Sequence, residues 1–413
     1  MSYRKEKLGH YIDILPGFAF KTKEFVEKGV PIIKIKNISS PSVTLDDLTY
    51  VSNEIAEKQK KFVLSYDDVL IAMTGSHINQ WTSVVGRVAR VKYNDKTLLN
   101  QRVGKITVKE HVEADVNYIY YFLSQDSIKI ALAAKAGGAA NQANISPTHI
   151  KELYFPCPDF STQKKISNIL KTYDNLIENN QKQIRLLKEA AQRLYKEWFV
   201  DLRFPGYEDV KIVDGVPEGW RKQKISDFGE IITGKTPSTA KEQYYGGNIP
   251  FVKIPDMHDC VYPITTESTL TSEGANTQKN KFIPKNGIMV SCIATVGLVN
   301  IAVESCQTNQ QINSIILNDE QDLYYTYSTM KRLKTLLEGV GSNGATMTNV
   351  NKTKFGNLEV LYPTDELRKM YNDFCQPIFE KIYALSISIN KLSLARDRLL
   401  PKLMNGEIEV LES

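Results

Sequence analysis

The amino-acid sequence predicts an α+β fold made by tandem duplication: two globular domains, each followed by a long helix, with the two helices pairing as an antiparallel coiled coil. Three observations predict it. The same motifs occur twice in the same order. Each copy ends in a long run with a helical spacing of apolar side chains. Within each copy, strand-like and helical runs mix without the regular alternation of a doubly wound sheet.

The duplication rests on four pairs of motifs. GVPIIKIKNI, DDVLIAM, NQRVGKI and NISPTHIKELYFPCP begin at Gly29, Asp67, Asn100 and Asn144. Their partners GNIPFVKIPDM, NGIMVSC, NQQINSI and NVNKTKFGNLEVLYP begin at Gly247, Asn286, Asn309 and Asn349. The separation between partners changes only by small insertions, so the chain is a tandem duplication.

Two segments are expected to form long helices. Ser161–Val200 contains no Gly or Pro, and its apolar residues are three and four positions apart, close to a heptad seam. A similar spacing follows Thr364. We expect Asn180 to lie in the first seam and fix its register, and Pro377 to kink the second helix or delay its start. The predicted seam residues are Ile166, Ile169, Tyr173, Leu176, Ile184, Leu187 and Leu194 in the first helix and Phe374, Ile378, Ile382, Leu385, Ile389 and Leu392 in the second.

The narrow apolar stripe leaves two interpretations of these helices. Either each is a long core helix of its own domain, or the two helices pair with each other. We favour pairing because a helix of about 60 Å exceeds one small domain. The Gly- and Pro-rich run Arg203–Trp220 is expected to link the copies. The predicted divisions are a first globular domain (1–158), a central helix (159–205), a second globular domain (206–362) and a C-terminal helix (363–413).

GEIITGKT, at Gly229–Thr236, fits the pattern of an ATP- or GTP-binding loop, but its sequence context does not. Such a loop needs a buried strand before it and a helix after it. Here the polar run WRKQKISDF precedes it, β-branched Ile231 and Ile232 lie inside it, and PSTAKEQYYGG follows. GVGSNG, at Gly339–Gly344, fits a dinucleotide-binding pattern but follows a helical run instead of a strand. We expect neither segment to bind a nucleotide.

Composition and motif content favour a binding protein over an enzyme. The five cysteines form no CxxC pair and the five histidines lie apart, so no metal-ligand spacing is present. No catalytic residue and no metal site are predicted. A net charge of +5 means that a polyanion would be held by local patches. No segment approaches the roughly 18 apolar residues of a membrane span, so we expect a cytoplasmic protein.

Polar loops supply candidate contacts to DNA. Asn and Gln can form two hydrogen bonds with adenine, Arg and Lys can do so with guanine, and Lys, Ser and Thr also hold phosphates. Polar loop residues can equally be solvated without any partner. The candidates in the first copy are Lys34, Thr74, Ser76, His77, Asn79, Gln80, Trp81, Asn100, Gln101, Arg102, Asn141 and Gln142. Those in the second copy are Lys235, Thr236, Ser238, Lys253, Thr295, Gln307, Asn309, Gln310, Ser342 and Asn343.

With the duplication and the two helices in view, the sequence resembles the specificity subunit of type I restriction-modification systems. The resemblance covers essentially the whole chain. The motifs that carry it are FPCPDFSTQKKISNIL, EAAQRLYKEWFVDLRFPGYE, GKTPST…YYGGNIPFVKIPDM and the ending ARDRLLPKLMNGEIEV. The chain departs from the family at Pro377 and at STQKK, where the family more often has an acidic Glu-Gln pair.

The resemblance implies a non-catalytic subunit that reads double-stranded DNA. Each globular half would be a target recognition domain for one part of a split sequence. The paired helices would set the spacing and dock two modification subunits, which hold S-adenosylmethionine and methylate adenine. Restriction subunits, where present, would bring ATP and Mg²⁺, and this chain would hold no cofactor. The alternative is a free-standing DNA-acting enzyme, a nuclease or an NTPase that uses GEIITGKT.

The duplication divides the DNA-contact candidates into two classes. Positions shared by both copies, such as Lys34 and Lys253, cannot encode two different half-sites, so we expect them to hold phosphates. An insertion in the first copy, within SHINQWTSV, has no counterpart in the second. Its polar and aromatic side chains are expected to read bases, unless the insertion is an ornamental surface loop.

Overall fold

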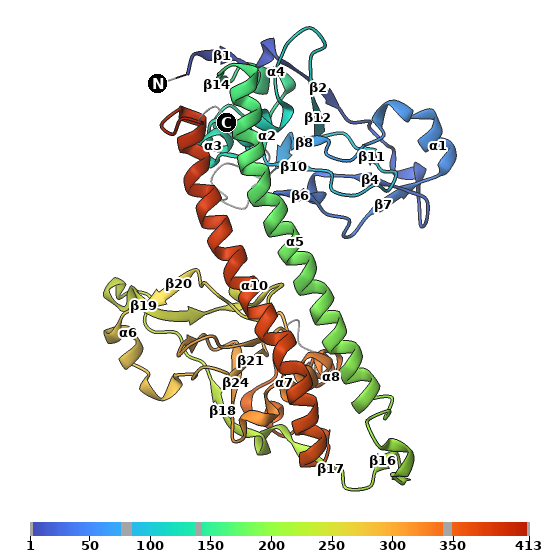
Figure 1. Ribbon diagram of the computed structural model, residues 1–413, viewed down its shortest axis with the longest axis vertical. Helices are drawn as coiled ribbons and strands as arrows, with labels where there is room; N and C mark the ends of the chain where they lie inside the picture. Colours follow the sequence, from blue (N-terminus) through green and yellow to red (C-terminus); the bar gives the residue numbers. More distant parts are fainter. Residues whose placement is uncertain (1–2, 76–84, 138–142, 342–348, 411–413) are drawn as a thin grey trace. The chain divides into compact units, whose positions relative to one another are not determined.

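The computed structural model describes residues 3–75, 85–137, 143–341 and 349–410 (Figure 1). It divides into two compact units, residues 1–175 with 392–413 and residues 176–391. Each unit contains one globular domain together with part of both long helices. Among the helices in the described ranges, none combines the length and apolar character needed to cross a membrane.

The domain of the first unit is built on two main sheets. A six-stranded sheet has the order β2-β12-β8-β10-β6-β5, and a four-stranded sheet has the order β11-β4-β7-β3. The strands are β1 (Lys5–Lys7), β2 (Ile12–Pro16), β3 (Phe25–Val26), β4 (Val30–Ile33), β5 (Ile38–Ser39), β6 (Ser42–Val43), β7 (Thr49–Val51), β8 (Val69–Ala72), β9 (Thr74–Gly75), β10 (Val88–Arg90), β11 (Leu98–Leu99), β12 (Val103–Val108), β13 (Ala143–Asn144) and β14 (Tyr154–Pro156). The short helices are α1 (Asn53–Lys58), α2 (Val116–Ser124), α3 (Asp126–Ala134) and α4 (Pro147–Lys151).

The domain of the second unit has a four-stranded sheet, β18-β24-β21-β22, and a three-stranded sheet, β20-β19-β23. The strands are β15 (Ile212–Val213), β16 (Val216–Pro217), β17 (Arg221–Lys224), β18 (Gly229–Thr233), β19 (Tyr245–Val252), β20 (Ser268–Leu270), β21 (Ile288–Ser291), β22 (Val299–Ile301), β23 (Gln307–Thr308), β24 (Ile312–Leu317) and β25 (Glu359–Tyr362). The short helices are α6 (Ser272–Asn276), α7 (Leu323–Arg332), α8 (Lys334–Gly341) and α9 (Lys352–Gly356).

The two domains repeat one arrangement, which confirms the tandem duplication. The order β18-β24-β21-β22 matches β2-β12-β8-β10, and neighbouring strands are antiparallel in both. A two-stranded ladder also recurs at the base of each long helix. In the first domain Glu6 lies opposite Phe155, and in the second Gln223 lies opposite Val360. The fold is therefore α+β, as predicted.

One helix covers the main sheet of the first domain. Asp115 caps α2 by accepting a hydrogen bond from the Tyr118 amide (2.7 Å). All residues from Tyr118 to Leu123 are buried, in a cluster that includes Ile71 and Ile106 of the sheet. Fully burying such side chains contributes roughly 1.5–3 kcal/mol each, so this layer forms the domain core. In the second domain α7 occupies the equivalent place.

The long helices are α5 (Phe160–Phe199) and α10 (Asp365–Asn405), and they pair in an antiparallel sense. Within the second unit, Asn180 Nδ2 donates to Ser388 Oγ (3.1 Å), and Tyr371 Oη donates to the Ala191 carbonyl (3.5 Å). Later residues of α5 therefore meet earlier residues of α10. Asn180 makes the interhelical contact that its place in the seam predicts.

The predicted seam is exposed at two positions. Leu176 and Phe374 expose 45% and 60% of their surface. Neighbouring residues take the interior places instead, Ile177 beside Leu176 and Cys375 beside Phe374. A straight helix drifts away from a strict seven-residue repeat, which shifts the inward face by one position. The other predicted seam residues are buried at Ile166, Ile382 and Leu385 and half-buried at Ile169, Tyr173, Ile184, Leu187, Leu194, Ile378, Ile389 and Leu392.

The expectation of a late start for the second helix is wrong. α10 begins at Asp365 and is helical through Pro377. A proline inside a helix leaves the carbonyl four residues earlier, here that of Asp373, without its amide partner. Both residues are exposed, so water can solvate this carbonyl. Packing of Cys375 and Phe379 in the core holds the helix on either side of the proline.

Candidate nucleic-acid interface

GEIITGKT does not form a phosphate-binding loop. Its first five residues are strand β18, and Thr233 lies opposite Asn313 of β24. Gly234 approaches so closely that an added Cβ would lie 2.2 Å from the Asn309 carbonyl oxygen. The next helical turn is the 3-10 turn Glu242–Tyr244, so no α-helix begins at the Gly-Lys-Thr. A phosphate-binding loop leads into the N-terminus of a helix, and this segment does not. Gly234 instead allows the close approach of neighbouring backbone.

We expect the isolated chain to show no ATP binding, and Lys235→Ala to leave that result unchanged. The reason is that the amide of Lys235 already donates to the Thr308 carbonyl (2.9 Å), within a turn that follows an extended strand. Isothermal titration calorimetry with ATP checks this. Micromolar binding that disappears in the variant would contradict it.

The exposed candidates of the second domain gather at one edge of its main sheet. Strands β18 and β21 end at this edge and β22 and β24 begin there, since Thr233 faces Asn313, Ser291 faces Ile312 and Val290 faces Val299. The loops that leave or enter these strand ends therefore lie together. They carry the exposed residues Lys235, Ser238, Thr295 and Gln310 and the half-buried Thr236.

Within this edge, two loops are joined directly. Thr236 Oγ1 donates to the side-chain oxygen of Gln310 (2.6 Å). This hydrogen bond uses the side-chain oxygen of Gln310 and does not involve its side-chain nitrogen. An exposed glutamine held in this way can present its remaining hydrogen-bonding groups to a nucleic acid.

The first domain presents the same edge. Strands β2 and β8 end there, and β10 and β12 begin there, since Pro16 faces Gly104, Ala72 faces Val103 and Ile71 faces Val88. Gln101 and Arg102 are exposed in the loop before β12. Arg102 has a φ of 74°, a left-handed conformation that is costly for a residue with a side chain and often marks a functional site.

Sequence reasoning missed one element of both edges. Gly17 packs against Asn100 as Gly234 packs against Asn309, with an added Cβ 2.2 Å from the carbonyl oxygen in each case. The signal was a glycine directly after an apolar strand in both copies. The likeness between the two glycines was not recognised because Gly234 lies in a segment that fits a nucleotide-binding motif, whereas Gly17 does not.

Among the candidates that the structure describes, four are buried and make hydrogen bonds within the fold. Gln307 is fully buried, donates to the Ala275 carbonyl (3.0 Å) and accepts from Gln278 (2.8 Å). Thr74 is 3% exposed and donates to Asn144 (2.8 Å). These two offer no surface to DNA, so their assignment as contacts is corrected.

Asn100 and Asn309 are the other two buried candidates, each 8% exposed. Their backbone amides make equivalent bonds, to the Ile33 carbonyl and to the Val252 carbonyl (3.1 Å each). The shared Asn therefore anchors its loop to the smaller sheet in both copies. Only the following residue of each pair, Gln101 or Gln310, is exposed.

Lys34 and Lys253 begin equivalent 3-10 turns directly after those two carbonyls. The Lys34 ammonium lies 4.5 Å from the centre of the Phe25 ring, and burial lowers the pKa of Lys34, with Lys36 adding to the effect. The Lys253 ammonium lies 3.8 Å from a Glu267 carboxylate oxygen. Both lysines therefore lie beside their edge loops, with their charges partly engaged by the protein.

Nine candidates lie outside the described residues. They are Ser76, His77, Asn79, Gln80, Trp81, Asn141, Gln142, Ser342 and Asn343. The described segments that flank them end at the same edges: Thr74–Gly75 pairs with Ala143–Asn144, and Ile293 bridges to Asn349. The chain therefore enters and leaves these segments beside the exposed candidates.

The chemistry of the described part is that of binding. Within it, no group of three or more His, Cys, Asp or Glu side chains could hold a metal ion. Burial raises the pKa of Cys292 to about 11 and that of Cys306 to about 12. Both thiols therefore stay protonated at neutral pH, which makes them poor nucleophiles. The two edges combine amides, hydroxyls, lysines and one arginine, the groups that contact bases and phosphates.

Comparison with known proteins gives one family description over most of the chain. The family model described as the type I restriction modification DNA specificity domain matches residues 3–189 and 217–382. The HindI specificity subunit of Haemophilus influenzae is 35% identical over 63% of this chain and 70% of its own length. The putative MjaX specificity subunit of Methanocaldococcus jannaschii is 26% identical over 92% of this chain and 88% of its own.

A solved structure shares the fold. The S subunit of a type I restriction-modification system from M. genitalium matches 100% of this chain and 97% of its own with a TM-score of 0.62. The sequence identity in this match is 15%, so the likeness concerns the fold alone.

Proposed function

Because the chain belongs to the family of type I restriction-modification DNA specificity subunits, we propose that each of its globular domains reads one half of a split double-stranded DNA target through the loop edge of its main sheet. One observation carries this proposal. Loops far apart in the sequence meet at the same edge in both copies, and they expose polar side chains there. Two equivalent edges on one chain suit a target in two parts.

The edge loops divide into shared and differing positions. Gln101 and Gln310 are equivalent and identical, so they position the duplex without choosing its sequence. The next residue is Arg102 in the first copy and Gln311 in the second. A guanidinium prefers guanine and a glutamine amide prefers adenine, so this position separates the two half-sites.

We further propose that the chain is non-catalytic and works through partners in the cytoplasm. Two modification subunits would bind the paired helices, hold S-adenosylmethionine and methylate adenine. Restriction subunits would add ATP- and Mg²⁺-dependent cleavage. The repeated helices support this arrangement, because a duplicated chain offers two equivalent surfaces to two copies of a partner.

Electrophoretic mobility shift tests the function. The probe is a duplex that carries the sequence methylated in cells expressing this chain with its modification subunit, and the competitor is the same duplex with one half-site scrambled. We expect tight binding to the intact target only, with log Kd linear in log salt. DNA cleavage or nucleotide hydrolysis by the purified chain alone would overturn the proposal.

Lys34→Ala is expected to weaken binding by a similar factor on every sequence and to lower the salt slope by about 1, because a phosphate contact carries no sequence information. Lys36→Ala is the matched control, since the neighbouring Lys36 ammonium already pairs with Asp47. Titrations of target and scrambled duplexes at several salt concentrations check this. A changed preference between sequences in Lys34→Ala would show that Lys34 reads a base.

A further inference from the structure

One place in the duplicated fold is built differently in the two copies. In the first unit the ammonium of Lys171, on α5, lies 2.7 Å from an Asp67 carboxylate oxygen. Lys92 binds the other oxygen of the same carboxylate at 2.9 Å. Asp67 lies in the turn before β8, so this ionic bridge fastens the domain to its helix.

The counterparts of the bridging pair in the second unit are neutral. Asp67 corresponds to Asn286: both have a positive φ, 67° and 68°, and their amides donate to the equivalent carbonyls of Val91 and Ala302. Lys171 corresponds to Gln376, because α5 and α10 begin at equivalent positions after the paired strands β14 and β25. The second copy thus lacks both charges of the bridge.

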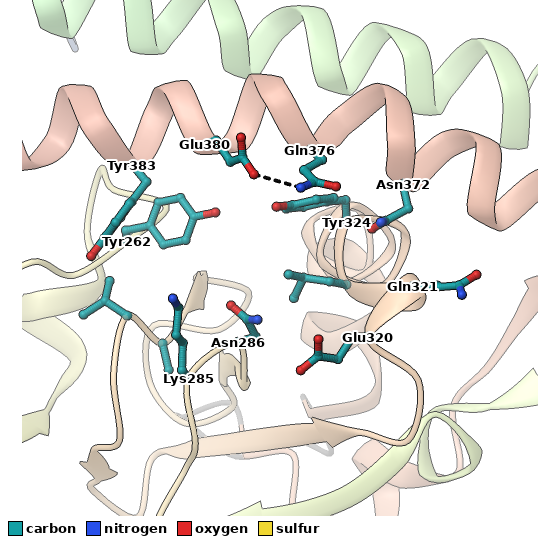
Figure 2. Close-up of a pocket in the computed structure, with 13 residues that line it drawn as sticks. Tyr262, Lys285, Asn286, Glu320, Gln321, Tyr324, Asn372, Gln376, Glu380 and Tyr383 are labelled. Carbon is teal, nitrogen blue, oxygen red and sulfur yellow. Dashed lines mark hydrogen bonds between the residues drawn. The ribbon is translucent and has the colours of Figure 1, made fainter.

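A cavity of about 410 Å³ is present at this place in the second unit. Gln376 turns along its own helix and donates to Glu380 (2.8 Å) instead of crossing to Asn286, as Figure 2 shows. Tyr262 and Tyr324 are buried in the lining, with Tyr383 half-buried beside Tyr262 at a ring distance of 5.2 Å. The space filled by a lysine in the first copy is therefore open and aromatic in the second.

The charges around the cavity favour a cation. Glu320 and Glu380 are exposed at its rim, whereas Lys285 is the one basic residue among the described residues that line it. Burial and then the negative charge of Glu380 raise the pKa of Tyr324 to about 12, which places this carboxylate close to the ring. Carboxylates beside tyrosine rings bind ammonium and guanidinium groups through ion pairing and cation–π attraction.

We propose that this cavity receives a lysine or arginine side chain of a modification subunit, which supplies from a partner chain the cation that Lys171 supplies within the first copy. The partner's identity rests on the proposed function. The entering cation pairs with Glu380 and lies against the tyrosine rings, where desolvation strengthens both attractions. In the first copy Lys171 already supplies this cation to Asp67, so the two otherwise equivalent surfaces differ at this one position.

The test transplants the bridge of the first copy into the second. Asn286→Asp with Gln376→Lys places a lysine of this chain in the cavity and leaves the net charge of the chain unchanged. We expect the double variant to unfold at or above the temperature of the parent chain, and its affinity for the modification subunit to fall at least tenfold. Titration calorimetry with the purified modification subunit measures the affinity.

Two further variants separate filling of the cavity from general disturbance. Asn286→Asp alone adds a carboxylate without filling the space, so its affinity should equal or exceed that of the parent. Glu380→Gln removes the paired carboxylate and should weaken binding even if the double variant folds poorly. Parental affinity in the double variant, or an equal loss in Asn286→Asp alone, overturns the inference and leaves the proposed function intact. A parent chain that does not bind the modification subunit overturns both.

Discussion

Asp174→Ala is expected to lower the free energy of unfolding by about 3–5 kcal/mol, because it leaves the buried guanidinium of Arg90 without its carboxylate. Asp174 is 9% exposed and lies between two arginines of the first unit. Its oxygens are 2.8 Å from Arg396 on α10 and 3.8 Å from Arg90 on β10, and Tyr121 donates to it at 2.6 Å. Urea denaturation followed by circular dichroism measures the loss.

The second copy supplies the control for this prediction. The counterparts of Arg90, Asp174 and Arg396 are Ile301, Phe379 and Ala191, and Phe379 stacks on Tyr324 with ring centres 4.5 Å apart. The triple variant Arg90→Ile, Asp174→Phe, Arg396→Ala copies this apolar set. We expect it to recover most of the lost stability, because apolar residues of similar volume can replace a buried ionic group. Parental stability in Asp174→Ala would show that the arginines find other partners.

Arg102→Gln is expected to change base preference in one half-site by ~1–3 kcal/mol, since in the proposed reading of DNA a guanidinium, which prefers guanine, is replaced by an amide, which prefers adenine. The substitution makes the first edge loop identical to the second at this position. Binding to duplex libraries with one half-site randomised measures the preference. Gln311→Arg is the reciprocal variant and should change the other half-site. An equal loss of affinity on all sequences would assign Arg102 to a phosphate.

The repeats made the fold predictable. Matching motifs identified two copies, and a helical spacing without Gly or Pro identified α5. Leu176 and Phe374 were predicted to face the interior but are exposed. A strict seven-residue repeat only approximates the geometry of a straight helix. The delayed start expected at Pro377 was wrong, because tertiary packing holds α10 helical on both sides of this exposed proline.

The site was less predictable because it depends on contacts between distant residues. Gln307 and Asn309 look like polar loop residues in the sequence, yet Gln307 is buried in strand β23 and Asn309 is buried directly after it. Asp174 lies on a helix whose polar side chains are mostly solvated, and nothing local shows that Arg90 and Arg396 converge on it. The cavity beside Gln376 exists because this side chain bonds to Glu380 and does not cross to Asn286. The sequence alone does not show which of these two residues it contacts.

The most direct test of the central claim is the methylated DNA sequence in cells that express this chain with its modification subunit. Base-resolution mapping of N6-methyladenine should give a motif in two parts separated by a spacer of fixed length. Arg102→Gln should alter one part and Gln311→Arg the other, with the spacer unchanged in both. A continuous motif, or a change in the same part with both variants, would contradict the assignment of one half-site to each domain.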